Sequence, residues 1–355
     1  MNDLLKFYNG KKVFITGHTG FKGTWLTRIL LYAGAHVTGY ALKPNTIPSL
    51  FDLTDTALSI KHISGDIRDG LKLADAVKKA EPEIVLHLAA QPLVRLSYRE
   101  PVLTYETNVM GTVHILEAIR NTNTVKSFVN ITTDKVYENK EWDWGYRENE
   151  NLCGFDPYSN SKSCSELVTY SYRNSFFAED SSPAVSTARS GNVIGGGDYA
   201  EDRIIPDCIR ATEKQQTIHI RNPQSTRPYQ HVLECLRGYL MLAKMQYMDK
   251  NIAGSYNFGP DEESCVTTGD LTDLFCSAWG SGASWKNEAE KNAPHEASFL
   301  KLDCSKSKKV LGWYPQWGIK TAVQKIVEWQ KAFDNGTPAA EITDLQIKEY
   351  FNDRN

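Results

Sequence analysis

The sequence predicts an α/β protein with a doubly wound parallel sheet and a smaller, mainly C-terminal α/β lobe. Apolar strand patterns alternate with helical patterns from residue 11 to about 190. Strands that are apolar along their whole length are typical of a parallel sheet with helices on both faces. The chain has 355 residues, which is long enough for two lobes.

Composition excludes several classes of protein. The net charge of −3 gives no basic field, so no nucleic-acid partner is expected. No apolar stretch approaches a membrane span and residues 1–10 lack the apolar core of a signal peptide, which predicts a cytoplasmic protein without a membrane partner. The seven cysteines are scattered and the eight histidines show no ligand spacing, so we expect free thiols and no metal.

The elements follow in a regular order up to residue 190. Strands are predicted at 13–16, 35–40, 60–64, 83–88, 125–132 and 184–189, with helices at 21–30, 71–80, 105–120 and 158–177. Beyond them we expect helices at 204–213, 231–245 and 319–333 and a strand at 255–258. The predicted lobes are 1–190 plus about 229–260 for a cofactor, and about 191–228 plus 261–355 for a substrate.

A glycine-rich turn joins the first strand to the first helix. Its spacing is G-x-x-G-x-x-G, and the glycines allow a tight turn with close approach of the backbone to a ligand. The helix that follows offers free N–H groups and a partial positive charge to a pyrophosphate. The turn predicts a dinucleotide site, with an ordinary strand-to-helix connection as the alternative. Its candidate residues are Gly17, Thr19, Gly20, Phe21, Lys22 and Gly23.

Tyr158 and Lys162 lie one turn apart in a helical pattern and therefore share a face. A cationic ammonium near a phenol favours the phenolate, so we expect Lys162 to lower the pKa of Tyr158. Such a tyrosine can take the proton of a sugar hydroxyl while a hydride leaves the carbon. The alternative is a pair of unrelated surface residues.

Thr133, Asp134 and Lys135 follow the fifth predicted strand directly. Open α/β sheets bind ligands at the carboxyl ends of their strands, so three consecutive polar side chains there can reach one substrate. A polar loop without a ligand is the alternative.

Together these features resemble the extended short-chain dehydrogenase/reductase family, whose fold is of the Rossmann type. Further marks are Gly65-Asp66, Leu88-Ala89-Ala90-Gln91, Asn108 with Gly111-Thr112, and the run 189–193. Thr-Asp followed by Lys is similar to the nucleotide-sugar 4,6-dehydratases, whereas sugar epimerases carry Ser-Ser or Ser-Thr and a small residue there. The strings 39–44, 137–139, 295–297 and 300–303 resemble the branch of that family that acts on CDP-glucose.

The resemblance implies NAD as the cofactor. One departure is that no acidic residue follows the second strand before Asp52, where the fingerprint expects a ribose ligand, and Lys43 keeps NADP open. The implied cofactor-binding residues are Gly17, Thr19, Gly20, Phe21, Lys22, Gly23, Asp66, Ile67, Leu88, Ala89, Ala90, Asn108, Tyr158, Lys162 and Arg189.

CDP-glucose is the implied substrate, and nothing in the composition distinguishes cytosine from another base. A diphosphate is bound well by cations and amides. The implied substrate-binding residues are Gln91, Asn192, Arg203, Arg227 and Asn257. A homodimer through helices 105–120 and 158–177 is implied as well.

The family's mechanism gives each catalytic residue a role. Tyr158, helped by Lys162 and Thr133, would deprotonate the C4 hydroxyl while a hydride passes to NAD. Lys135 would then remove the C5 proton and Asp134 would protonate the departing C6 hydroxyl, after which the hydride returns to C6. To act as a base Lys135 must be neutral, and to act as an acid Asp134 must be protonated, which is the opposite of the usual state of each residue. A proton shared by the pair would help to meet both requirements.

Other interpretations stay open. A different nucleotide-sugar 4,6-dehydratase would use the same residues, and a nucleotide-sugar 4-epimerase would need Tyr158 and Lys162 but not Asp134 and Lys135. A non-catalytic NAD-sensing regulator could share the fold, although the intact catalytic residues argue against it. The implied pathway is dideoxy-sugar synthesis for bacterial O-antigen lipopolysaccharide.

Overall fold

A seven-stranded parallel sheet forms the centre of the protein in a computed structural model that describes residues 3–288 and 299–352. The strand order is β11-β6-β5-β4-β1-β2-β3, and the predicted fold class is confirmed. The strands are β1 (Lys12–Thr16), β2 (His36–Ala41), β3 (Lys61–Ser64), β4 (Ile84–His87), β5 (Ser127–Ile131), β6 (Ala184–Ser190) and β11 (Ser255–Phe258).

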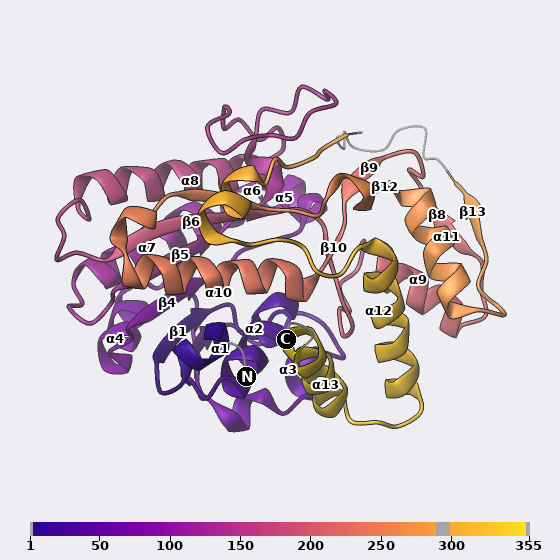
Figure 1. The fold of residues 1–355 in the computed structure, drawn as a ribbon, viewed down its shortest axis with the longest axis horizontal. Helices are drawn as coiled ribbons and strands as arrows, with labels where there is room; N and C mark the ends of the chain where they lie inside the picture. The colour runs from indigo at the N-terminus through magenta and orange to yellow at the C-terminus, as the bar shows by residue number, and fades with distance from the viewer. Residues whose placement is uncertain (1–2, 289–298, 353–355) are drawn as a thin grey trace.

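Two helical layers cover the sheet. One contains α1 (Asp3–Tyr8), α2 (Phe21–Tyr32) and α10 (Val232–Met248), and the other contains α4 (Gly70–Ala80), α7 (Gly111–Arg120) and α8 (Pro157–Ser175). Successive strand residues point to opposite faces, so Val13 and Ile15 pack into the first layer while Phe14 packs into the second. Figure 1 shows α10 running along the sheet.

The helix predicted at 105–120 is one part of a longer helical segment. That segment begins with α5 (Val94–Arg99) and α6 (Pro101–Tyr105), and a π-helical turn (Glu106–Met110) leads into α7. Gly111 opens α7 where a Cβ would lie 2.5 Å from Cδ1 of Ile67, so only glycine lets the helix pack this closely.

The second lobe lies at one end of the molecule, where Figure 1 shows α9, α11, β8 and β13 gathered. Its buried core is built from isoleucine, leucine and phenylalanine side chains of these elements and of α12. The elements outside the main sheet are β7 (Val193–Ile194), α9 (Ile204–Glu213), β8 (Ile218–Ile220), β9 (Thr226–Pro228), β10 (Gln230–His231), β12 (Cys265–Thr267), α11 (Thr268–Trp279), β13 (Trp285–Asn287) and α12 (Ile319–Asp334).

The C-terminal helix α13 (Ala339–Asn352) does not join that lobe's core but packs against α2 and α3 (Leu50–Leu53). Glu234 of α10 anchors the segment that leads into α12, because its buried carboxylate accepts the backbone N–H groups of Gln316 and Trp317. The strand β11 lies in the main sheet beside β6. The exact lobe boundaries given by the sequence stay a prediction.

Short turns complete the chain. They are 3-10 turns at Thr56–Ser59, Asp134–Val136, Lys250–Ile252 and Glu262–Ser264 and a second π-helical turn at Ser307–Leu311. In the described ranges we find no helix long and apolar enough to cross a membrane.

Candidate active site

The glycine turn is shaped for close backbone approach. Gly17 has a φ of +76°, and a Cβ there would lie 2.6 Å from the backbone nitrogen of Ala89, so a side chain is excluded. Gly20 is the N-cap residue of α2, and no side chain caps that helix within the described residues. The N–H groups of its first turn are therefore available to an anion, which fits the pyrophosphate of a dinucleotide.

Lys22 extends from this turn into the interior. Its buried Nζ donates to Oγ of Ser190 at 3.0 Å, and that hydroxyl lies 2.6 Å from the hydroxyl of Tyr239. Burial lowers the pKa of the Lys22 ammonium. Sequence reasoning did not select Ser190 or Tyr239 as site residues, because Tyr239 belongs to a helix whose apolar pattern indicates only core.

The predicted adenine side is partly occupied by internal contacts. Asp66 accepts from the backbone N–H of Arg68 at 2.9 Å and from its guanidinium, which lowers the pKa of the carboxyl. At the end of β2, where an acid would bind ribose, Thr19 donates its hydroxyl to the carbonyl of Leu42 at 2.9 Å. Cofactor contacts of Asp66, Ile67 and 88–90 stay predictions.

Tyr158 lies at the start of α8, whose N-cap Asp156 accepts from the N–H of Ser159 at 3.0 Å. Burial raises the pKa of Tyr158 to about 12, and a hydrogen bond with the Thr133 hydroxyl opposes that rise. Lys162 donates its Nζ to the carbonyl of Ile131 at 3.0 Å. Burial therefore outweighs the groups that lower the tyrosine pKa, and a backbone carbonyl holds the Lys162 ammonium, so the expectation that Lys162 lowers this pKa stays a prediction.

Asp134 and Lys135 form an ion pair on the 3-10 turn after β5. Lys135 Nζ lies 3.2 Å from Oδ1 of Asp134 and 3.3 Å from Oδ1 of Asn192, and Thr133 donates to the same aspartate oxygen at 2.9 Å. Asp134 is 1% exposed, and in the described part of the chain its Oδ2 has no hydrogen-bond partner. A buried polar atom without a partner is a candidate contact for a ligand hydroxyl.

Two arginines lie on the predicted substrate side. Arg203 forms an ion pair with Asp198 at 2.9 Å and is close enough to Tyr158 to lower the pKa of its phenol. Arg227 is buried on β9, where its Nη1 donates to the carbonyl of Thr226 at 3.1 Å. The structure therefore brings Thr133, Asp134, Lys135, Tyr158, Asn192 and Arg203 together; the diphosphate contacts of both arginines stay predictions.

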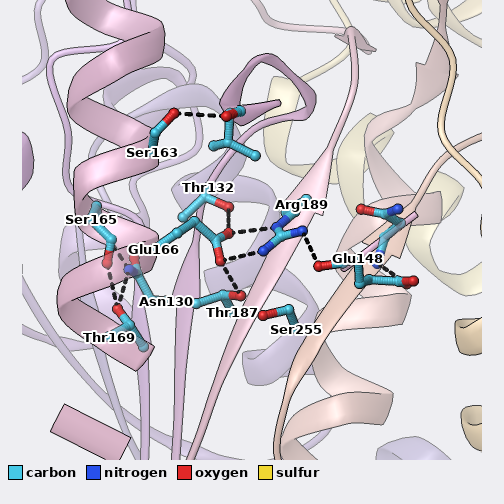
Figure 2. A network of polar contacts seen from close by, with 12 residues as sticks. Asn130, Thr132, Glu148, Ser163, Ser165, Glu166, Thr169, Thr187, Arg189 and Ser255 are labelled. Carbon is cyan, nitrogen blue, oxygen red and sulfur yellow. Dashed lines mark hydrogen bonds and ion pairs between the residues drawn. The ribbon is translucent and has the colours of Figure 1, made fainter. Parts of the chain in front are cut away.

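Arg189 does not offer its guanidinium to a cofactor, which corrects the sequence-based prediction. The side chain is buried and makes a two-pronged ion pair with Glu166, with Nε and Nη2 each 2.9 Å from a carboxylate oxygen (Figure 2). Its Nη1 donates to the Tyr137 hydroxyl at 2.7 Å and to the carbonyl of Glu148 at 3.0 Å. These contacts occupy every nitrogen of the guanidinium.

Asn257 uses its side chain inside the fold. Its Oδ1 accepts from Tyr137 at 2.7 Å, and its Nδ2 donates to the carbonyls of Tyr146 and Asp303 at 2.8 and 3.0 Å. Both N–H groups of the amide are thus used, and the substrate contact of Asn257 stays a prediction.

The side chains of Asn108 and Gln91 also form hydrogen bonds inside the protein. The Asn108 amide exchanges hydrogen bonds with the backbone of Gln91 at 2.8 and 3.1 Å and donates to Ser161 at 2.8 Å. The Gln91 amide donates to Thr104 at 2.9 Å and accepts from the N–H of Leu93 at 2.6 Å. The cofactor contact of Asn108 and the substrate contact of Gln91 both stay predictions.

No metal centre is formed by the residues that the structure describes, among which no group of three or more His, Cys, Asp and Glu side chains comes together. The string 295–297, which supported the resemblance, lies outside the described residues.

A doubly wound sheet with a glycine turn and a Tyr-x-x-x-Lys helix at the carboxyl ends of its strands defines the extended short-chain dehydrogenase/reductase class. Structural comparison agrees. UDP-glucuronic acid 4-epimerase from Bacillus cereus, solved with UDP-glucuronic acid and NAD, superimposes with a TM-score of 0.77 at 22% identity, covering 90% of this chain and 99% of that one. dTDP-glucose 4,6-dehydratase from Bacillus anthracis, solved with NAD, superimposes with a TM-score of 0.75 at 18% identity, covering 91% of this chain and 97% of that one.

Sequence comparison identifies the family. The family model described as GDP-mannose 4,6 dehydratase matches residues 14–326, and the chain belongs to this family of nucleotide-sugar dehydratases. The chain is 49% identical to CDP-glucose 4,6-dehydratase of Salmonella typhimurium over 351 residues, which is 98% of each chain. It is 27% identical to dTDP-glucose 4,6-dehydratase of Streptomyces antibioticus over 90% of this chain and 92% of that one.

The charge of Lys162 gives a testable pH dependence. Burial, together with the nearby Lys22 ammonium, lowers its pKa to about 8. If turnover needs the cationic form, kcat falls as the pH rises through about 8. Lys22→Met removes the neighbouring charge, so the pKa of Lys162 rises and the alkaline limb of kcat at saturating cofactor moves to higher pH. An alkaline limb that stays in place would contradict the assignment.

Proposed function

We propose that this protein is a CDP-glucose 4,6-dehydratase, a hydro-lyase that converts CDP-glucose to CDP-4-keto-6-deoxyglucose and water. The 49% identity over 98% of both chains supports the substrate, since the Salmonella typhimurium relative carries that name. The observation that carries the reaction is the Asp134–Lys135 ion pair beside Tyr158, in which the buried Asp134 has a carboxylate oxygen free of partners among the described residues. A reaction in the cytoplasm stays part of the proposal.

NAD is the proposed cofactor. The turn from Gly17 to Gly23 would hold its pyrophosphate, and Tyr158 and Lys162 would lie beside its reactive ring. When bound, NAD supplies the hydride acceptor for sugar carbon C4 and the hydride donor for C6. Several structural relatives were solved with NAD, which supports NAD over NADP.

The chain's own residues supply the proton transfers. Tyr158 takes the proton of the C4 hydroxyl, with Thr133 as its hydrogen-bond partner. The resulting C4 ketone makes the C5 proton acidic, and Lys135 removes it. Asp134 gives its proton to the C6 hydroxyl, which leaves as water, and Lys135 exchanges its proton with solvent and returns one to C5. Tyr158 releases the C4 proton to solvent, and a proton from solvent restores Asp134. Because Lys135 and Asp134 lie 3.2 Å apart, one shared proton can satisfy both roles.

The same site argues against an epimerase and against a regulator. An epimerase has no use for an acid–base pair directed at C5 and C6, whereas this chain pairs a buried Asp134 with Lys135. A regulator that only senses NAD would not need Tyr158, Lys162 and Thr133 together.

A direct assay tests this proposal. The protein is incubated with the glucose or mannose nucleotides of CDP, dTDP, UDP and GDP, and the 4-keto-6-deoxy product is detected by its absorbance in alkali. We expect conversion of CDP-glucose. Conversion of another sugar nucleotide without CDP-glucose would refute the substrate, and formation of a 4-epimer would refute the reaction.

A homodimer is proposed through the exposed apolar side chains of α6, the π-helical turn and α8. Val102, Met110, Leu167 and Tyr170 are exposed there, beside a hollow of about 470 Å³ lined by Pro101, Tyr105 and Val109 among others. Large exposed apolar patches mark interaction surfaces. We expect Leu167→Glu to shift the protein from dimer to monomer in sedimentation, while Leu71→Glu, at an exposed position of α4, leaves it a dimer. A parent protein that sediments as a monomer would contradict the proposal.

A further inference from the structure

A buried ion pair connects the helix that carries Tyr158 and Lys162 with the turn that carries Asp134 and Lys135. Glu166 of α8 and Arg189 of β6 are each 2% exposed, and their side chains form a two-pronged pair (Figure 2). Glu166 lies one turn beyond Lys162 on the helix that also carries Tyr158, so it is fixed to the half of the site that would oxidise C4.

The Glu166–Arg189 pair also forms hydrogen bonds with the residues on both sides of the segment 133–135. Before the segment, the Thr132 hydroxyl donates to Oε1 of Glu166 at 2.5 Å (Figure 2). After it, the Tyr137 hydroxyl accepts from Nη1 of Arg189 at 2.7 Å. Thr132 before the turn with Asp134 and Lys135, and Tyr137 after it, are thus both hydrogen-bonded to one ion pair.

Stability alone is a weak reason for such a pair. Removing two charges from water is costly, and well-packed apolar side chains of similar volume often stabilise a fold as much. A bidentate Arg–carboxylate pair does fix geometry, however, because its two parallel hydrogen bonds set both distance and orientation. The pair has four partners here. They are Thr132 directly after β5, Tyr137 after the turn, Thr187 of β6 and the carbonyl of Glu148.

We propose that the Glu166–Arg189 pair is a positioning device that sets the Asp134–Lys135 turn against Tyr158, so that a sugar oxidised at C4 proceeds to water loss. This rests on the proposed function, because the sugar must meet Tyr158 first and the Asp134–Lys135 pair second. Glu166 and Arg189 touch neither substrate nor cofactor in this account and act through Thr132 and Tyr137.

Two threonines provide a matched test. Thr132 and Thr187 are both buried, and each donates its hydroxyl to a different oxygen of Glu166, at 2.5 and 2.6 Å (Figure 2). Only Thr132 adjoins the turn with Asp134 and Lys135. Thr132→Val and Thr187→Val therefore remove the same kind of bond from the same carboxylate, with and without a direct link to the turn.

The readouts are the melting temperature and, by mass spectrometry in D₂O, the amounts of 4-ketone, of 4-keto-6-deoxy product and of deuterium at C5. We expect similar melting temperatures for both variants. Thr132→Val should lose about tenfold or more in water elimination and accumulate the 4-ketone, since small misplacements of catalytic groups cost that much. Thr187→Val should stay within about twofold of the parent, and Thr132→Ser, which keeps the hydroxyl, should recover elimination.

Equal losses of elimination in Thr132→Val and Thr187→Val would overturn the proposal, as would an equal slowing of oxidation and elimination in Thr132→Val. If Thr132→Val does not fold, Tyr137→Phe breaks the other contact and must produce the same accumulation of ketone. Failure of the proposed function is distinguishable, because it would appear in the unmodified protein as absence of any keto product and would overturn both claims.

Discussion

Lys135→Ala is expected to abolish exchange of the C5 hydrogen with solvent while oxidation of C4 survives. Lys135 Nζ is paired with Asp134 and Asn192, and Tyr158, which acts at C4, is a separate group. General base catalysis contributes about 10²–10⁴-fold, so we expect dehydration to fall by about 10²-fold or more. The measurement is deuterium incorporation at C5 in D₂O, followed beside the amount of 4-ketone formed.

Lys140→Ala is the matched control. Lys140 lies on the loop that follows the site, and its ammonium faces Glu138 at 3.9 Å with about half of the side chain exposed. Its removal should leave C5 exchange unchanged. Full exchange in Lys135→Ala would show that another group is the base.

Arg189→Met is expected to cost about 3–5 kcal/mol in the free energy of unfolding, because it leaves Glu166 as an unpaired buried carboxylate. Denaturant unfolding measures this at neutral pH. Lys79→Met is the control, since its pair with Asp75 is 68% and 58% exposed, and its loss should cost about 0.5 kcal/mol or less. A loss below about 1 kcal/mol in Arg189→Met would contradict the structural role of the pair.

The pKa of Glu166 determines how the free energies of unfolding of the parent and of Arg189→Met change with pH. Burial raises the pKa of this carboxyl, but the Arg189 guanidinium and hydrogen bonds lower it to a net value below the ordinary one. The pair therefore stabilises the parent above the unfolded pKa of glutamate, and this contribution is lost as the pH falls through the folded pKa. In Arg189→Met the carboxyl can take a proton, so the stability gap between parent and variant should narrow as the pH falls below neutral.

The sheet could be predicted because its signals are local. Most of its strands are short, largely apolar runs between helical patterns, and the glycine turn is contiguous in sequence. The close packing of Gly111 on Ile67, next to the π-helical turn, joins residues far apart in sequence, which no local pattern encodes. Helix α13 was not predicted. Its buried Ile342, Ile347 and Tyr350 lie at helical spacing, but the polar residues between them weaken the apolar periodicity of the segment.

The site was predictable where its residues are neighbours in the chain. Thr133, Asp134 and Lys135 share one turn, and Asp134 and Lys135 form the expected pair. Arg189 was misassigned because a motif locates a residue without giving the direction of its side chain. Adjacent strand residues face opposite sides, so Ser190 reaches Lys22 while Arg189 turns to Glu166. Likewise, the amide of Asn257 binds partners distant in sequence.

In the proposed reaction, hydrogen leaves C4 and returns to C6 of the same sugar, with water lost between the two steps. The most direct test uses CDP-glucose carrying deuterium at C4, converted by a catalytic amount of protein in ordinary water. We predict that the 4-keto-6-deoxy product carries this deuterium at C6 and a solvent hydrogen at C5. A product without deuterium at C6, or recovered sugar with deuterium still at C4 and an inverted configuration, would contradict the account.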